Sequence, residues 1–198
     1  MFEQIKGIYP GSFDPFTVGH ADILMKALSV FNTIDIIVSV NYDKKHMFNS
    51  EQRAAIISKS IKDLHIPAGK VVNIIIYGGI LAEYEDTCQK YKKVIIRGLR
   101  NHIDLDYEQS LEEFNSSVSP EVETCYFSAT ANNRQVSSSL VRNFLATNHI
   151  GNAKSVLCNG GFVQIKQYIS NDKDSIISSF SKEITVHSVI EGVHCISK

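Results

Sequence analysis

Strand-like and helix-like segments alternate over the first two thirds of this chain, and the alternation restricts the folds open to it. Thr33–Val40 is rich in β-branched residues, as expected of a strand buried on both faces. The predicted strands are Gln4–Tyr9, Thr33–Val40, Val71–Tyr77, Val94–Ile96 and Val122–Phe127, and the predicted helices are Ala21–Phe31, Asn49–Leu64, Ile80–Tyr91 and Asp104–Phe114. This order predicts an α/β fold with a doubly wound, five-stranded parallel sheet and helices on both faces. Ligands of such sheets bind beyond the carboxyl ends of the strands.

Composition excludes several classes of protein. The 198 residues carry a formal net charge of −1, so no overall basic field favours nucleic acid or an acidic membrane. No apolar run approaches the roughly 20 residues that span a bilayer, and the first residues do not resemble a signal peptide. The cysteines are scattered, without a metal-binding spacing, as is typical of reduced thiols; they are Cys88, Cys125, Cys158 and Cys195. A cytoplasmic location is therefore expected.

The loop after the first predicted strand, Tyr9–His20, contains two glycines and two prolines and runs directly into a helix. It brings Ser12 and His20 to the end of a strand and the start of a helix, where backbone N–H groups and the helix dipole favour an anion. A packed or solvated histidine is the ordinary alternative for His20. The loop lacks the Gly-Lys-Ser/Thr of a Walker motif and the GxGxxG of a dinucleotide fold, so by itself it predicts a phosphate site.

The same stretch, Tyr-Pro-Gly-Ser-Phe-Asp-Pro followed by Thr-Val-Gly-His, resembles the signature of bacterial phosphopantetheine adenylyltransferases. Thr-x-Gly-His alone marks a wider superfamily of nucleotidyltransferases, whereas the full string is much more specific. Three further stretches match in the expected order, so the resemblance covers roughly residues 5 to 150. It implies a Rossmann-like fold and places Ser12, Phe13 and His20 at ATP, with Ser12 also at the acceptor.

Two further stretches carry positive charge. Asn41–Phe48 resembles the family's S-x-x-K-x-x-M-F, which implicates Lys44 in binding and catalysis at the substrate phosphate, although a loop lysine is usually a solvated one. Arg97 and Arg100 flank a glycine at the end of a predicted buried strand, and their planar, paired donors suit phosphate oxygens. The resemblance of this stretch to R-G-L-R…D-x-x-Y-E implies catalytic and acceptor contacts for Arg97. It implies ATP contacts for the group Gly98, Leu99, Arg100 and Glu108.

The fourth stretch precedes an apolar helical run. Its serines predict a helix N-cap, and a helix start rich in donors can also hold phosphates, so both interpretations stand together. The resemblance assigns these residues to ATP: Val136, Ser137, Ser138 and Ser139. The preceding loop departs from the aromatic and hydroxyl residues common in relatives, which leaves base recognition open; it consists of Asn133, Arg134 and Gln135. Leu81 corresponds to the wall of the family's pantetheine channel, with a hydrophobic helix start as the alternative.

The implied reaction is transfer of the adenylyl group of ATP to 4′-phosphopantetheine, which yields dephospho-coenzyme A and pyrophosphate. Mg²⁺ is expected with ATP, without protein ligands. The resemblance also implies a homohexamer and inhibition by coenzyme A, with neither nucleic acid nor membrane as partner. The division expected is a nucleotidyltransferase domain, 1–170, and a C-terminal extension of unknown role, 171–198. The alternatives are a related transferase that uses nicotinamide mononucleotide or CTP, and a non-catalytic nucleotide-binding protein.

Overall fold

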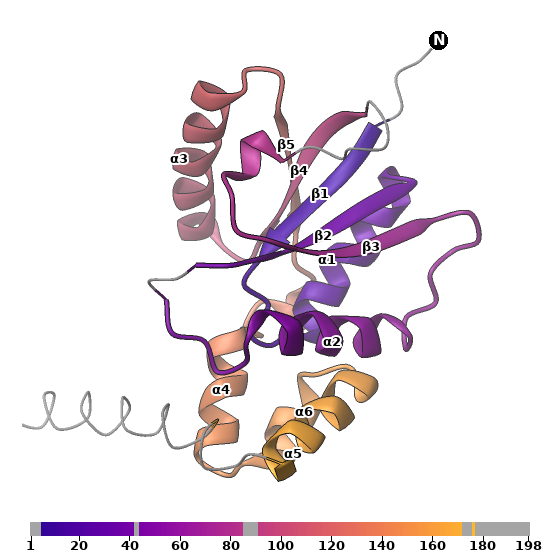
Figure 1. Ribbon diagram of the computed structural model, residues 1–198, viewed down its shortest axis with the longest axis vertical. Coiled ribbons are helices and arrows are strands. Elements are labelled where there is room, and N and C mark those ends of the chain that lie inside the picture. The colour runs from indigo at the N-terminus through magenta and orange to yellow at the C-terminus, as the bar shows by residue number, and fades with distance from the viewer. Residues whose placement is uncertain (1–4, 42–43, 85–90, 172–175, 177–198) are drawn as a thin grey trace, which may run out of the picture.

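A five-stranded parallel sheet forms the centre of the protein (Figure 1). The computed structural model describes residues 5–41, 44–84, 91–171 and 176. The strands are β1 Ile5–Gly11, β2 Thr33–Ser39, β3 Val71–Tyr77, β4 Lys92–Leu99 and β5 Glu123–Ser128. Their spatial order is β3-β2-β1-β4-β5, so the strand order reverses between β1 and β4. The predicted doubly wound sheet is confirmed, and its switch point lies where the first loop and the arginine pair begin.

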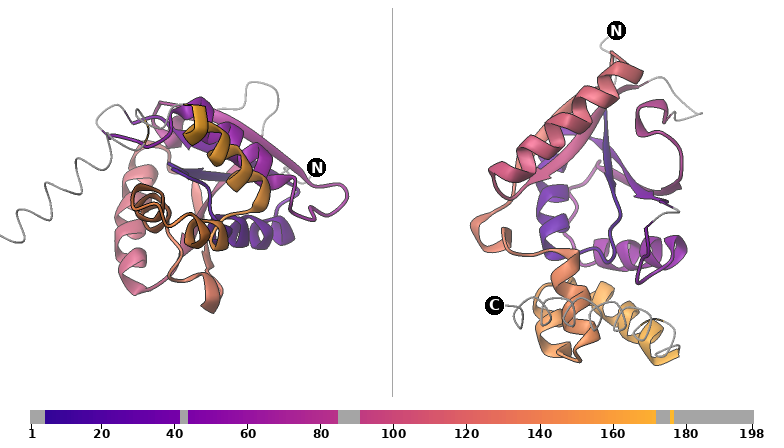
Figure 2. Two further views of the ribbon diagram at one scale, coloured as in Figure 1. Left: turned by 90° about the horizontal axis from the view of Figure 1, so that it is seen from below. Right: turned by 90° about the vertical axis from the view of Figure 1, so that its left-hand side faces the viewer.

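Helices cover both faces of the sheet (Figure 2). The α-helices are α1 Val18–Val30, α2 Ser50–Ile61, α3 His102–Val118, α4 Ser138–Ala146, α5 Ile150–Ser155 and α6 Asn159–Asn171; the 3-10 helices are η1 Leu81–Glu83 and η2 Ala131–Asn133. Helices α1 and α2 pack on one face, and α3 and η1 lie on the other. Helices α4, α5 and α6 lie beyond the carboxyl ends of the strands, below the sheet in Figure 1.

Side-chain caps explain where two of the helices begin. Asn49 Oδ1 accepts the N–H of Gln52, and Gln52 Oε1 accepts the N–H of Asn49, which confirms the predicted cap. Thr17 and His20 form the same reciprocal arrangement at the start of α1. The apolar side of α1 then packs into the main core with the inner face of the sheet, where Leu24, Ile34 and Ile36 are completely buried.

The predicted helix Ile80–Tyr91 is wrong for the residues that the structure describes. Only Leu81–Glu83 forms a helix, a single 3-10 turn, and residues 85–90 lie outside the described residues. Tyr84 leaves the helical conformation because its hydroxyl donates to Asp35 Oδ2 at 3.0 Å, which draws the chain onto the sheet. Strand β4 is also longer than the predicted Val94–Ile96 at both ends.

Helix α6 lies in a part of the chain for which no element was predicted. It packs against α2, and the Tyr168 and Phe48 ring centroids are 6.3 Å apart. Beyond it, Ile176 is 6% exposed and belongs to the main core. The rest of the predicted extension, 172–175 and 177–198, lies outside the described residues. Among the helices that are described, none has the length and apolar character to cross a membrane.

Candidate active site

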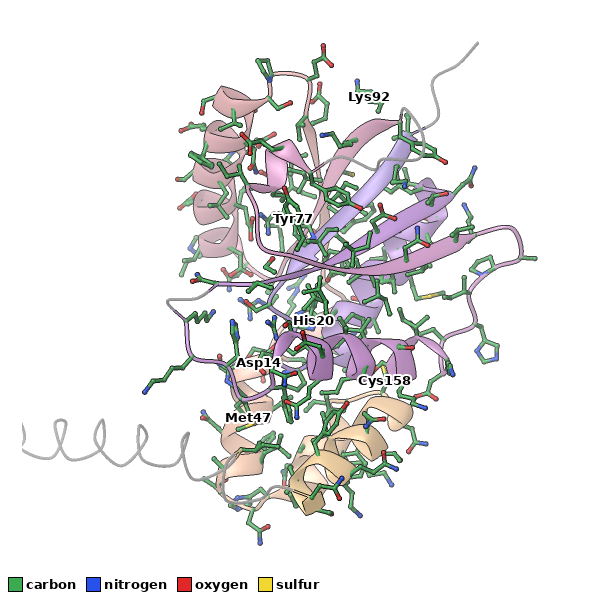
Figure 3. All side chains as sticks on the ribbon, viewed as in Figure 1. Asp14, His20, Met47, Tyr77, Lys92 and Cys158 are labelled. Atoms are coloured by element: carbon green, nitrogen blue, oxygen red, sulfur yellow. The ribbon has the colours of Figure 1, made fainter. Side chains whose placement is uncertain are left out.

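A cavity of about 330 Å³ opens at the carboxyl ends of β1 and β4, at the switch point of the sheet. Figure 3 shows His20 and Asp14 at this end of the sheet, between the strands and α4, with Lys92 at the opposite end. The predicted residues that line the cavity are Phe13, His20, Arg97, Gly98, Arg100, Glu108, Asn133, Val136, Ser137, Ser138 and Ser139. Four separate segments of the chain therefore converge on one space.

His20 is held by its own helix cap. The Thr17 N–H donates to His20 Nδ1 at 3.0 Å, so Nδ1 is an acceptor and the neutral ring carries its proton on Nε2. Phe13 and Phe16 pack against the imidazole, with ring centroids 5.1 and 5.5 Å from it. Burial, with a smaller contribution from the positive charge of Arg100, lowers the pKa of His20 to about 4. At neutral pH the site therefore contains a neutral imidazole that can donate one hydrogen bond.

The turn beneath this histidine has an unusual backbone. Phe13 has a φ of 48°, in the left-handed region that residues other than glycine seldom occupy. Its ring is 3% exposed and also lies against Tyr9, with centroids 5.3 Å apart. Packing on both sides stabilises the strained turn, which directs the chain from β1 toward the start of α1.

The two arginines of β4 and its following turn have acidic partners. Arg97 Nε lies 3.0 Å from Glu108 Oε2, and both side chains are mostly buried. Burial raises the pKa of Glu108, and Arg97 opposes that shift. Arg100 donates from Nε and Nη2 to Asp104, one turn into α3, and its side chain is 43% exposed. Both guanidinium groups are thus oriented at the cavity, where they can meet phosphate oxygens.

Helix α4 begins at the opposite wall. Ser137 Oγ accepts the Leu140 N–H at 3.1 Å, so the predicted serine cap is confirmed. Ser138 Oγ donates to the Pro15 carbonyl at 2.9 Å, which ties this helix start to the first loop. The positive end of α4 therefore adjoins the cavity, as an anion site requires.

Several predicted residues lie away from the lining. Ser12 and Lys44 lie on the loops after β1 and β2, Leu81 packs in η1 against the second, smaller core, and Leu99 accepts the Ala129 N–H through its carbonyl. The cavity thus gathers most, but not all, of the residues predicted for ATP. The residues absent from the lining are Ser12, Lys44, Leu81, Leu99, Arg134 and Gln135.

Thr17 and Gly19 line the cavity although the sequence interpretation did not select them. The spacing of Thr17 and His20 carried a usable signal, because a hydroxyl followed three residues later by an acceptor is a capping pattern. A Cβ at Gly19 would lie 3.6 Å from the Val136 carbonyl oxygen. The missing side chain therefore lets the segment before α4 lie close to the start of α1. Tyr9 and Ile23 also line the cavity and had no signal beyond their strand and helix patterns.

Solved structures share this fold. A bifunctional NMN adenylyltransferase/ADP ribose pyrophosphatase from Francisella tularensis, complexed with AMP and a manganese ion, matches with a TM-score of 0.71 at 15% identity, over 98% of this chain and 56% of that one. The Plasmodium falciparum nicotinic acid mononucleotide adenylyltransferase, complexed with NaAD, matches with a TM-score of 0.59 at 17% identity, over 84% and 96%.

Sequence comparison is more specific. A family model described as cytidylyltransferase-like matches residues 8–144. The phosphopantetheine adenylyltransferase of Nautilia profundicola is 38% identical over 143 residues, which is 72% of this chain and 88% of that protein. That of Clostridium kluyveri is 39% identical over 137 residues, or 69% and 79%. The matched part contains the whole cavity and the loops around it, and the chain belongs to the phosphopantetheine adenylyltransferase family of cytidylyltransferase-like nucleotidyltransferases.

Proposed function

We propose that this protein transfers the adenylyl group of ATP to 4′-phosphopantetheine, which yields dephospho-coenzyme A and pyrophosphate. The observation that carries the proposal is the position of His20, a neutral donor at a cavity that also contains Arg97 and Arg100. The cytidylyltransferase-like family model matches residues 8–144, which include the whole cavity lining, and relatives named phosphopantetheine adenylyltransferase match 69–72% of the chain. A cavity lined by cations, a helix start and a neutral donor suits a polyphosphate ligand.

In the proposed reaction, an oxygen of the 4′-phosphate attacks the α-phosphorus of ATP in line. The new P–O bond forms as the bond from the α-phosphorus to the oxygen of the leaving pyrophosphate breaks. The attacking phosphate is already an anion, so the reaction needs positioning and charge stabilisation rather than a strong base. His20 Nε2–H donates to an α-phosphate oxygen, and Lys44 adds positive charge there.

The remaining residues orient the two substrates. Arg97, fixed by Glu108, holds the acceptor phosphate together with Ser12, and Leu81 contacts the pantetheine arm. The ATP side consists of Phe13, Gly98, Leu99, Arg100, Glu108 and the loop and helix start 133–139. Because Ser12, Lys44 and Leu81 lie beyond the cavity lining, the acceptor is expected to bind at the side of the cavity that faces β2 and β3.

Magnesium is proposed as the counter-ion of ATP, held by phosphates and water. Among the described residues, no group of three or more His, Cys, Asp or Glu side chains is arranged to hold a metal ion. The cavity instead presents arginines, which bind phosphate oxygens and not metal ions. The proposed ion therefore enters with the nucleotide and is not held by protein ligands. The ion would neutralise phosphate charge.

The family resemblance extends the proposal to the assembly and its surroundings. We propose a cytoplasmic homohexamer, with coenzyme A as an inhibitor and a C-terminal extension of unknown role over 171–198, of which Ile176 packs in the main core. Exposed apolar side chains on α3, among them Ile103 and Phe114 at 66% and 54% exposure, support self-association.

Pyrophosphate release tests the function directly. Purified protein with ATP, Mg²⁺ and 4′-phosphopantetheine is expected to release pyrophosphate only when the acceptor is present. Loss of one preorganised donor typically lowers kcat about 10²–10³-fold, so His20→Ala should lose at least about 100-fold. His65→Ala is the matched control, because His65 is exposed and lies far along the chain from the cavity lining.

The alternatives give different results in the same assay. Turnover only with nicotinamide mononucleotide, or only with CTP, would identify a related transferase of another specificity. Nucleotide binding without turnover on any acceptor would indicate a non-catalytic protein. Equal activity of the His20→Ala and His65→Ala variants would contradict the assigned role of His20.

A further inference from the structure

Among the residues that the structure describes, Arg53 has the largest fully buried side chain, at 2% exposure. It lies in the second turn of α2, and its guanidinium donates only to backbone carbonyls among the bonds described. Nε donates to Phe48 at 3.1 Å, and Nη1 donates to Ser12 at 2.5 Å and to Ser39 at 3.0 Å. Burying a charged group is costly unless it is hydrogen-bonded. The three bonds therefore stabilise the buried guanidinium and, in turn, hold the three carbonyls in place.

The three carbonyls belong to the loops that carry the proposed acceptor residues. Ser39 is the last residue of β2 and Phe48 immediately precedes the cap of α2, so they are the two stems of the loop that contains Lys44. Ser12 is on the loop after β1, which leads to His20. One guanidinium therefore closes the base of the Lys44 loop and joins it to the loop of Ser12.

Asp14 binds the same two loops from the other side. Its carboxylate accepts the N–H groups of Met47 at 2.9 Å and Phe48 at 3.0 Å, and it is 2% exposed. Arg142 of α4 lies 3.8 Å from this carboxylate and donates to the Asp14 carbonyl at 2.7 Å. Figure 3 shows Asp14 and Met47 side by side below His20. The carboxylate also offsets part of the cost of burying Arg53 nearby.

We infer that Arg53, with Asp14, is a positioning residue for the acceptor half of the active site: it sets the place of Lys44 and Ser12 relative to His20. This inference rests on the proposed function. Neither residue lines the cavity, so neither touches ATP there. Their effect on the reaction passes through the loop geometry, and displacement of a catalytic group by about 1 Å can cost 100-fold in rate.

The test uses Arg53→Lys, which keeps the charge and loses the planar fork that reaches both stems. We expect kcat with 4′-phosphopantetheine to fall about tenfold or more, while KM for ATP stays within about twofold. In a Lys44→Ala background, the same substitution should cost clearly less than in the wild type, because one of the two groups that Arg53 positions is already gone. Asp14→Asn, which removes the negative charge that accepts the Met47 and Phe48 N–H groups, should show the same pattern.

Ile56→Val is the matched control for stability. Ile56 is completely buried one turn further along α2 and touches neither loop through hydrogen bonds, so the variant should lose stability and keep kcat. The inference would be overturned if the losses in kcat from Arg53→Lys and Lys44→Ala simply added in the double variant. It would also be overturned if KM for ATP rose by the same factor as kcat fell. Unchanged kcat in Arg53→Lys would overturn it as well.

Amide hydrogen exchange separates this inference from the proposed function. In Arg53→Lys, the Met47 and Phe48 amides should exchange about tenfold faster or more, while Ile95 in β4 keeps its protection. If wild-type protein releases no pyrophosphate with 4′-phosphopantetheine, the proposed function fails, and faster exchange would still establish the anchor of the loop. Unchanged exchange at Met47 and Phe48 would show that Arg53 does not hold the base of the Lys44 loop.

Discussion

His20 serves two purposes with one ring. Nδ1 accepts the Thr17 N–H and completes the cap of α1, and this bond leaves the proton of the neutral ring on Nε2. A protonated ring would need Nδ1 as a donor and would lose the cap. The bond therefore couples the start of the helix to the protonation state that the proposed reaction requires.

The stability of the protein should depend on the protonation of His20. The pKa of His20 is about 4, below its ordinary 6.5, so the folded protein binds fewer protons than the unfolded chain between these values. The free energy of unfolding should therefore fall as pH drops from about 6.5 to about 4, by roughly 1–3 kcal/mol from this group. In His20→Gln, urea titrations across this range should show a shallower fall.

Activity supplies the complementary measurement. Because His20 stays neutral, kcat should show no step near pH 6.5, the value at which an ordinary histidine changes charge. A step at that pH which disappears in His20→Gln would contradict the neutral ring. His65→Ala again serves as the control for a solvent-exposed histidine.

At the scale of elements, α6 lies against α2 because two glycines remove side chains from the contact. A Cβ at Gly160 would lie 2.5 Å from the Lys59 carbonyl oxygen, and one at Gly161 would lie 2.2 Å from Ser60 Oγ. The Gly160 N–H also donates to Asp63 Oδ2 at 2.6 Å. These two glycines are thus the residues that let α6 pack closely on α2.

The prediction is a loss of stability from one added methyl group. Gly160→Ala should lower the free energy of unfolding by about 1–3 kcal/mol, because a backbone carbonyl cannot move aside cheaply. Gly151→Ala, within α5, should leave it unchanged or raise it by about 0.5–1 kcal/mol, since nothing lies within 4 Å of the added atom. Urea midpoints of the two variants measure the difference, and equal midpoints would contradict the close approach.

At the scale of the whole molecule, α3 stands out among the described helices. Its 17 residues cover β4 and β5, yet Asn115, at 7% exposure, is the one buried residue among those of the helix whose burial is described. Ile103, Phe114 and Val118 fall on one side of the helix and are 66%, 54% and 38% exposed. Such a stripe on a long helix favours contact with another apolar surface.

The prediction follows from the proposed homo-oligomer. Phe114→Asp should lower the sedimentation coefficient at micromolar concentration, because a carboxylate would be buried at the contact. Val163→Asp is the matched control, since Val163 on α6 is similarly exposed, at 48%, and lies in another layer. Equal sedimentation of Phe114→Asp and the wild type would place the contact elsewhere.

The alternation of strands and helices could be predicted because local composition controls it: β2 and β3 end within a residue of the predicted positions. The cavity could be predicted because parallel strands bring their following loops to one edge, where His20, Arg97 and Arg100 meet. The helix expected over Ile80–Tyr91 failed, since the bond between Tyr84 and Asp35 joins residues 49 positions apart.

Sequence pattern alone therefore determines the sheet, its switch point and the identity of the family, because these depend on local periodicity and on contiguous motifs. The anchoring of the loops depends on the folded chain. Arginine side chains are mostly exposed in folded proteins, yet Arg53 is buried, because carbonyls 5, 14 and 41 positions away converge on its guanidinium. The same holds for the neutral state of His20, which follows from burial and from the distance to Arg100. Long-range geometry of this kind arises only when the chain has folded, since no local pattern specifies which distant groups will meet.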